Sequence, residues 1–279
     1  MCNGGPSGSS WCRVGEARTY AALLGAQVRS ATAYRASFLI ELASSLGATV
    51  LDVVSVFVLF SAATTVGGFR FAQAVMMTAL TLSGFVVADF AVGNVDRLKT
   101  YVRTGALDAV LVRPLGALPQ LLLMDLPLRK TLRLVFGVSM LAVAIGLNDI
   151  AWTPARVLLI VVAPAAAAVF FSAIFVLSAS LAFWWIESGE VGAAFTYGGR
   201  DFTTYPITVY SGWFRTVFAY ALGFAFVSYH PALAILGLVD PLGMPAWTGY
   251  LSPLVALLAA ALAALVWRTG IRHYRSTGS

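Results

Sequence analysis

Apolar stretches long enough to cross a lipid bilayer recur along this chain and limit what it can fold into. A helix of about 20 apolar residues spans the roughly 30 Å hydrocarbon core of a membrane. Only 11% of the 279 residues are charged, whereas soluble domains carry about 25%. With so few charges, lipid must cover much of the surface. The sequence therefore predicts an all-α integral membrane protein.

The predicted transmembrane helices are six in number and cover residues 38–62, 71–92, 128–147, 155–186, 207–227 and 250–267. A polar, glycine-rich and serine-rich leader at residues 1–13 is predicted to be disordered, before a single membrane domain over residues 14–279. Residues 14–35 combine apolar side chains at helical spacing with charges. That pattern predicts an amphipathic helix at the membrane surface, and an ordinary solvated helix is the alternative.

Two stretches interrupt this pattern. Residues 187–206 are polar and glycine-rich, and we predict a loop there. Four prolines between residues 230 and 253 exclude one straight spanning helix, so short re-entrant helices are predicted before the sixth span. His230 stands at the start of this stretch, where we interpret it as an interfacial or capping residue and not as a catalytic base.

Basic residues are distributed very unevenly between the two sides of the predicted spans. Sixteen Lys and Arg fall on the side of the termini, whereas only Arg70 and Arg156 fall on the other. Positive loops stay in the cytoplasm, which predicts cytoplasmic termini. The same bias accounts for the net charge of +6, so no nucleic-acid partner is needed to explain it.

Motifs for catalysis or metal binding are missing from the sequence. Neither lysine belongs to a G-x-x-x-x-G-K-[ST] phosphate loop, and there is no H-E-x-x-H motif. Cys2 and Cys12, both in the leader, are too few for a disulfide framework or a metal site. We therefore expect no enzymatic activity, metal or cofactor in this chain.

Acidic residues inside predicted spans are the candidates for a substrate path. Asp52 lies near the middle of the first span, where a charge costs about 2.5–3.5 kcal/mol on insertion scales. It either lines a transport path or makes a hydrogen-bonded contact between helices. Glu41 and Asp89 lie near span ends, and we expect them to reach water or to be hydrogen-bonded there.

The segment at residues 93–133, between the second and third spans, contains seven of the 18 Lys and Arg. Its first part has an apolar face formed by Val95, Leu98, Tyr101 and Val102. Gly105 ends that helix, and a second apolar face begins at Leu107 and stops at Pro114. The sequence predicts two short amphipathic helices on the cytoplasmic side. The positive-inside rule explains the basic residues, but it does not explain why the segment is so long and has two apolar faces.

Two phrases carry a family resemblance. RTGALDAVLVRPLGALP, at residues 103–119, resembles the form R-x-G-x-L-D-x-x-L-x-R-P found after the second span in bacterial ABC type-2 permeases of the multidrug and antibiotic exporter group. DFTTYPITVYSGWFR, at residues 201–215, resembles the phrase before their fifth span. The resemblance extends over about residues 14–274.

The resemblance implies an export permease for drug-like or amphiphilic substrates in the cell membrane. It implies two ABC ATP-binding subunits as partners, which hold ATP and Mg, and a second permease copy or a sister permease. Carried over by position, the element that couples to the ATPase includes Arg97, Lys99, Arg103, Gly105, Asp108, Arg113 and Pro114. An exporter of lipids or lipid-linked glycans with the same architecture, and an ion-coupled secondary transporter, are the alternatives.

Overall fold

The structure is a computed structural model that describes residues 64–113, 116–124 and 130–274, and isolated positions between 40 and 61. Helices make up most of this part of the chain, and its one β contact is an isolated bridge between Val66 and Phe69. The prediction of an all-α protein is confirmed over these residues. The leader, the amphipathic segment at 14–35, Glu41 and Asp52 lie outside them.

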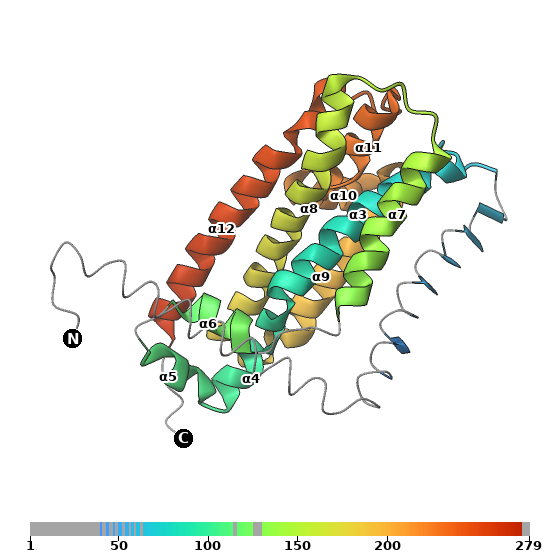
Figure 1. Ribbon diagram of the computed structural model, residues 1–279. Coiled ribbons are helices and arrows are strands. Elements are labelled where there is room, and N and C mark those ends of the chain that lie inside the picture. Colours follow the sequence, from blue (N-terminus) through green and yellow to red (C-terminus); the bar gives the residue numbers. More distant parts are fainter. Residues whose placement is uncertain are drawn as a thin grey trace, which may run out of the picture.

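Four helices form the body of the molecule, three of which run in one direction while α7 runs in the other (Figure 1). They are α3 (Phe71–Val92), α7 (Thr131–Leu147), α8 (Pro154–Ser180) and α12 (Ser252–His273). Helix α8 packs against both α3 and α12, and α7 packs against α3. We call the end of the bundle where α3 finishes the loop-side end, and the opposite end the far end. The short helices α4 (Leu98–Arg103), α5 (Ala106–Leu111) and α6 (Ala117–Met124) lie at the loop-side end.

The centre of the bundle lies between α3 and α8. Phe85 of α3 is fully buried and meets Phe171 and Phe175 of α8 with ring centroids 5.2 and 5.5 Å apart. Gly84 allows this approach, because a Cβ there would overlap the side chain of Ala167 on α8. By contrast, leucines on the outer face of α12 are largely exposed, as expected of a lipid-facing surface (Leu254, Leu257, Leu258, Leu262 and Leu265).

Three helical segments in the described residues are long and apolar enough to cross a membrane. They are Phe71–Arg103, Pro154–Phe183 and Ala246–His273. A bent pair, Gly212–Ala221 and Phe224–Leu236, adds a fourth if it counts as one span. Helix α7 is apolar but shorter, and the isolated positions described in the first predicted span are helical. The chain is thus a multi-pass membrane protein, and the count of six spans stays a prediction.

The predicted loop at residues 187–206 is wrong. After the short turns η3 (Leu181–Phe183) and η4 (Ile186–Ser188), a regular helix, α9 (Gly189–Thr204), packs against α3 and α8. Its polar residues are compatible with burial because α3 supplies partners. The hydroxyls of Thr78 and Thr81 donate to the carbonyls of Thr204 and Thr203 over 3.0 and 2.9 Å.

The fifth predicted span, residues 207–227, is also wrong as a continuous helix. The chain instead forms four short pieces: η5 (Ile207–Val209), α10 (Gly212–Arg215), the π-helix η6 (Thr216–Ala221) and η7 (Phe224–Phe226). The last piece is followed by α11 (Tyr229–Leu236), and the axis bends by 59° between η6 and η7. Thr208 donates to the carbonyl of Gly67 over 2.7 Å, so this segment reaches the far end.

His230 is buried within the protein at the far end, and its interfacial or capping role stays a prediction. Its Nδ1 lies 3.9 Å from Oδ2 of Asp240, and the hydroxyl of Tyr229 donates to Oδ1 of Asp240 over 2.7 Å. The turn η8 (Ala246–Leu251) then leads into α12. Short helices do precede α12, as predicted, and their re-entrant nature stays a prediction.

Candidate functional site

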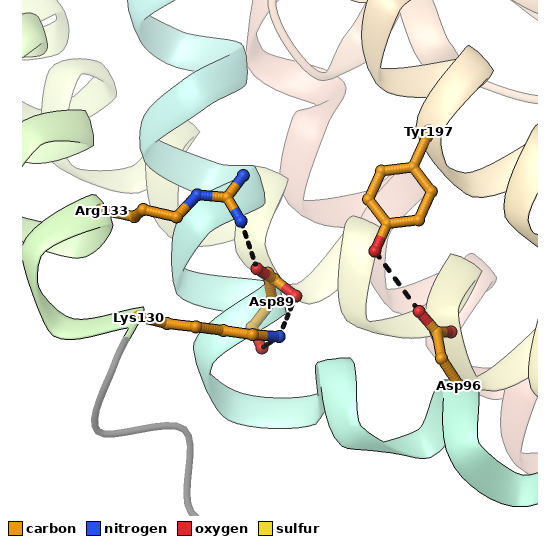
Figure 2. A network of polar contacts seen from close by, with 5 residues as sticks. All are labelled: Asp89, Asp96, Lys130, Arg133 and Tyr197. Atoms are coloured by element: carbon orange, nitrogen blue, oxygen red, sulfur yellow. Dashed lines mark hydrogen bonds and ion pairs between the residues drawn. The ribbon is translucent and has the colours of Figure 1, made fainter. Parts of the chain in front are cut away.

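A buried ion-pair cluster ties the loop-side end of α3 to the start of α7 (Figure 2). Asp89 is 3% exposed. Its Oδ1 lies 2.5 Å from Nζ of Lys130, and its Oδ2 accepts from Nη1 of Arg133 over 3.2 Å. A buried carboxylate is costly unless it is paired and hydrogen-bonded, and both conditions hold here. The cluster therefore fixes the distance between the two helices that flank the basic segment.

Of the two expectations for Asp89, the hydrogen-bonded contact at a span end is confirmed, and exposure to water is not. The carboxylate points into protein, and its partners come from residues more than forty positions further along the chain. Gly93 lies against the cluster, where a Cβ would meet both Oδ1 of Asp89 and Nζ of Lys130. The turn that leaves α3 is therefore packed directly on the ion pairs.

The chain continues from α3 through the 3-10 turn η1 (Gly93–Arg97) into α4. Val95, Leu98 and Val102 are buried in the main core, which confirms the predicted apolar face of this element. Tyr101 is half-buried and packs against the same core. Because η1 and α4 share a hydrophobic core with α8, a displacement of their exposed face would be transmitted to the bundle.

Gly105 separates α4 from α5, as predicted. Its φ of 70° is left-handed, a conformation that L residues with a Cβ adopt only at a cost. Leu107 and Val110 of α5 are buried. Gln120 of α6 donates to the carbonyl of Val110 over 3.3 Å, so α5 and α6 are joined. The predicted pair of short helices is thus confirmed for its described residues, which exclude Pro114.

Two of the predicted basic site residues form ion pairs with the turn η4 and with the start of α9. Arg103 Nη2 lies 2.9 Å from Oε1 of Glu187, and Lys99 Nζ lies 3.5 Å from Oε1 of Glu190. Both pairs are exposed, with side-chain exposures of 70% and 70% for the first and 43% and 93% for the second. Exposed pairs of this kind contribute about 0–1 kcal/mol. They leave the basic residues at a surface that a partner can reach.

A third contact connects the site to the aromatic centre of the bundle. The hydroxyl of Tyr197 on α9 donates to Oδ2 of Asp96 in η1 over 3.4 Å (Figure 2). The Tyr197 ring lies 5.7 Å from Phe85 and 6.1 Å from Phe175. The loop-side element, α9 and the core are therefore linked through one side chain.

A sequence model of the family described as "ABC-2 family transporter protein" matches residues 46–278, most of the chain. The chain belongs to this family. It is therefore an ABC type-2 permease, a membrane transport component and not a catalytic unit, and the family implies association with ABC ATP-binding subunits. Comparisons with curated proteins and with solved structures gave no match. The family match does not favour the ion-coupled secondary transporter considered above.

The remaining predicted site residues of this ABC-2 permease are spread over its loop-side surface. Arg97 and Arg113 are exposed, and Asp108 is half-buried in α5. Asp52 and Pro114 lie outside the described residues. In the part of the chain that the structure describes, no group of three or more His, Cys, Asp and Glu could hold a metal ion.

Sequence reasoning missed the acidic partners in the permease. Glu187 and Glu190 lie in the predicted loop, and the contact of Asp96 with Tyr197 was not predicted. A charge signal was present, because the two glutamates are the only acids between residues 150 and 200. Their pairing with α4 depends on α9 starting at the loop-side end, which the composition did not indicate.

Proposed function

We propose that this chain is the membrane-spanning permease subunit of an ATP-driven ABC exporter, energised by separate ATP-binding subunits. The observation that supports this most directly is the element η1–α4–α5. It is helical, basic on its exposed side and buried on its other side in the main core, and its first residue, Gly93, packs against the Asp89 cluster that joins α3 to α7. A chain without a phosphate loop of its own needs such a surface to receive motion from an ATPase.

In this mechanism, closure of the ATP-binding subunits pushes the exposed face of α4 and α5. The rigid contacts of that element pass the displacement to α3, α7 and α8. A tilt of those helices opens a path toward the far end between two permeases. Substrate enters from the cytoplasm or from the inner leaflet. The predicted amphipathic helix at residues 14–35 serves as a second contact with the ATPase.

The orientation that this mechanism needs is supported by the distribution of basic residues. Arg200 lies within the bundle, 5.3 Å from the centre of the Phe85 ring, and Arg215 follows the segment that reaches the far end. With these two reassigned, the predicted topology assigns fourteen Lys and Arg to the loop side and three to the far end. The bias still favours a cytoplasmic loop side, with both termini there, in the cell membrane.

The partners in this proposal are two ATP-binding subunits and a second permease, either another copy or a sister chain. Drug-like or amphiphilic molecules are the proposed substrates, and lipids or lipid-linked glycans are the alternative of the same architecture. If Asp52 lines the path, Asp52→Asn reduces export of cationic substrates and leaves neutral ones unchanged. If Asp52 only joins helices, both substrate classes respond alike.

The experiment uses the complex assembled with its ATP-binding subunits. Charge reversal by Lys99→Glu and Arg103→Glu should abolish substrate-stimulated ATPase activity while copurification is retained. Because each reversal also breaks an internal ion pair, Glu190→Gln and Glu187→Gln are the matched controls. These controls break the same pairs and keep the basic surface.

Normal stimulation in the two reversals would refute the coupling role. Equal losses in the reversals and in the glutamine controls would show that the internal pairs, and not the basic surface, carry the effect. Transport that continues without ATP and stops when the proton gradient is dissipated would instead support the ion-coupled alternative.

A further inference from the structure

A groove of about 900 Å³ lies on the side of the bundle, away from the contacts of the Asp89 cluster. Helices α8 and α12 form its two long walls, and α6 lines its loop-side end. Most of its lining is small and apolar, including Ala168 and Ala173 of α8 and Ala260, Ala263 and Ala264 of α12. Because facing alanines do not fill the space between two helices, the groove needs an occupant to restore close packing.

The charge at the loop-side end of the groove limits the chemistry of that occupant. Arg268 and Arg272 line this end, one helical turn apart on α12. The lining contains no acidic residue. In the described part of the chain, no acidic side chain forms an ion pair with either guanidinium. Paired guanidinium groups bind phosphate with bidentate geometry, so the occupant carries an anionic phosphate beside its apolar part.

The dimensions of the groove match one leaflet of a bilayer. The lining of α12 extends over the thirteen residues from Ala260 to Arg272, whose first and last Cα atoms are about 18 Å apart along the helix. Half of the hydrocarbon core is about 15 Å thick. A lipid of the loop-side leaflet would therefore place its acyl chain along the alanines and its headgroup at the arginines.

The charge of the groove favours a lipid over a helix of a second copy. Basic pockets between helices at the cytoplasmic face bind anionic headgroups, whereas an apolar transmembrane helix would bring no anion to Arg268 and Arg272.

We propose that this groove is a binding site for an anionic phospholipid, with the phosphate on Arg268 and Arg272 and an acyl chain between α8 and α12. The assignment of the lipid to the cytoplasmic leaflet rests on the orientation in the proposed function. The bound lipid joins α12 to α6, which follows the coupling helices in the chain. The lipid composition of the membrane thereby acts on the same end of the permease that receives the ATPase.

Trp267 makes the site measurable, because it lines the groove and is 6% exposed. The full-length permease is reconstituted in nanodiscs that contain increasing fractions of brominated phosphatidylglycerol or brominated phosphatidylcholine. Bromine quenches tryptophan on contact, and the difference between the native chain and Trp267→Phe isolates the signal of Trp267. We expect the anionic lipid to quench this signal at a lower mole fraction than the zwitterionic lipid.

Variants then separate the headgroup contact from the apolar contact. Each of Arg268→Ala and Arg272→Ala should weaken the preference for phosphatidylglycerol about fivefold, and the double variant about 30-fold. Ala264→Phe fills the groove and should reduce quenching by both lipids. Arg70→Ala removes an exposed positive charge at the far end and should leave the preference unchanged.

Equal quenching by the two lipids, or an unchanged preference in the double variant, would overturn the proposal. Absence of quenching by either lipid would do the same, and would indicate that another segment of this chain or a second copy covers the groove. If the double variant does not fold, native mass spectrometry of the unmodified chain with the two lipids decides the question. No ATP-binding subunit is needed, so failure here leaves the proposed transport function untouched.

Discussion

The Asp89 cluster allows a quantitative test of how the loop-side end is held together. Asp89→Asn keeps the shape of the side chain but leaves Lys130 and Arg133, whose side chains are 26% and 18% exposed, without their counter-charge. Removing one partner of a buried pair costs about 3–5 kcal/mol. The partial exposure of the two cations lets them turn toward water, so we expect about 3 kcal/mol, the low end of that range.

Thermal unfolding of the purified protein in detergent measures this effect. A loss of about 3 kcal/mol corresponds to a fall in Tm of about 6–12 °C for a chain of this size. Glu187→Gln is the matched control, because it removes a glutamate that also faces an arginine at 2.9 Å, but in an exposed pair. Its cost should be about 1 kcal/mol or less.

A second variant distinguishes lost attraction from an uncompensated charge. Combining Asp89→Leu with Lys130→Met and Arg133→Met removes all three charges, and buried ion clusters replaced by apolar residues are often neutral or stabilising. The triple variant should therefore recover most of the Tm lost in Asp89→Asn. A Tm in Asp89→Asn equal to that of the native chain would refute the reasoning, as would a triple variant less stable than the single one.

Three further substitutions test the packing. Gly105→Ala should lower the free energy of unfolding by about 1–2 kcal/mol, because the φ of this residue is left-handed. An unchanged Tm would contradict the left-handed conformation of Gly105. Gly84→Ala should lower the free energy of unfolding by about 1–3 kcal/mol, because the added methyl group overlaps Ala167. Its control is Gly146→Ala in α7, where the space around the glycine is open. This control should leave the free energy of unfolding unchanged or raise it by up to about 1 kcal/mol. Phe85→Ala should lose about 3–5 kcal/mol of unfolding free energy by chemical denaturation, and a smaller loss than that of Gly84→Ala would count against its central position.

Patterns within one stretch of sequence predicted the helix ends and buried faces that depend only on neighbouring residues. Helix α3 begins and ends where the apolar run does, at Phe71 and Val92. The break at Gly105 was predictable because a glycine between two short apolar faces needs no distant partner to end a helix. The buried face of Val95, Leu98 and Val102 follows from helical spacing alone.

Contacts between distant segments could not be predicted from such patterns. Helix α9 could not be predicted because its glycines, threonines and tyrosine have the composition of a loop. Its burial depends on hydrogen bonds from Thr78 and Thr81 of α3. The partners of Asp89 are separated from it by 41 and 44 residues. The periodicity of one helix does not predict which residues of another segment it contacts. The ion-pair cluster could therefore be seen only in the folded structure.

The end of α9 has a consequence for how the protein is made. The last carbonyls of a helix have no partner within it, and hydrocarbon offers none. Here, the carbonyl of Thr203 accepts from both Thr81 and Ser228, and that of Thr204 accepts from Thr78. Helix α9 therefore cannot settle in the bilayer as an independent unit during synthesis. Helix α3, made more than a hundred residues earlier, is already in place when α9 emerges and acts as its template.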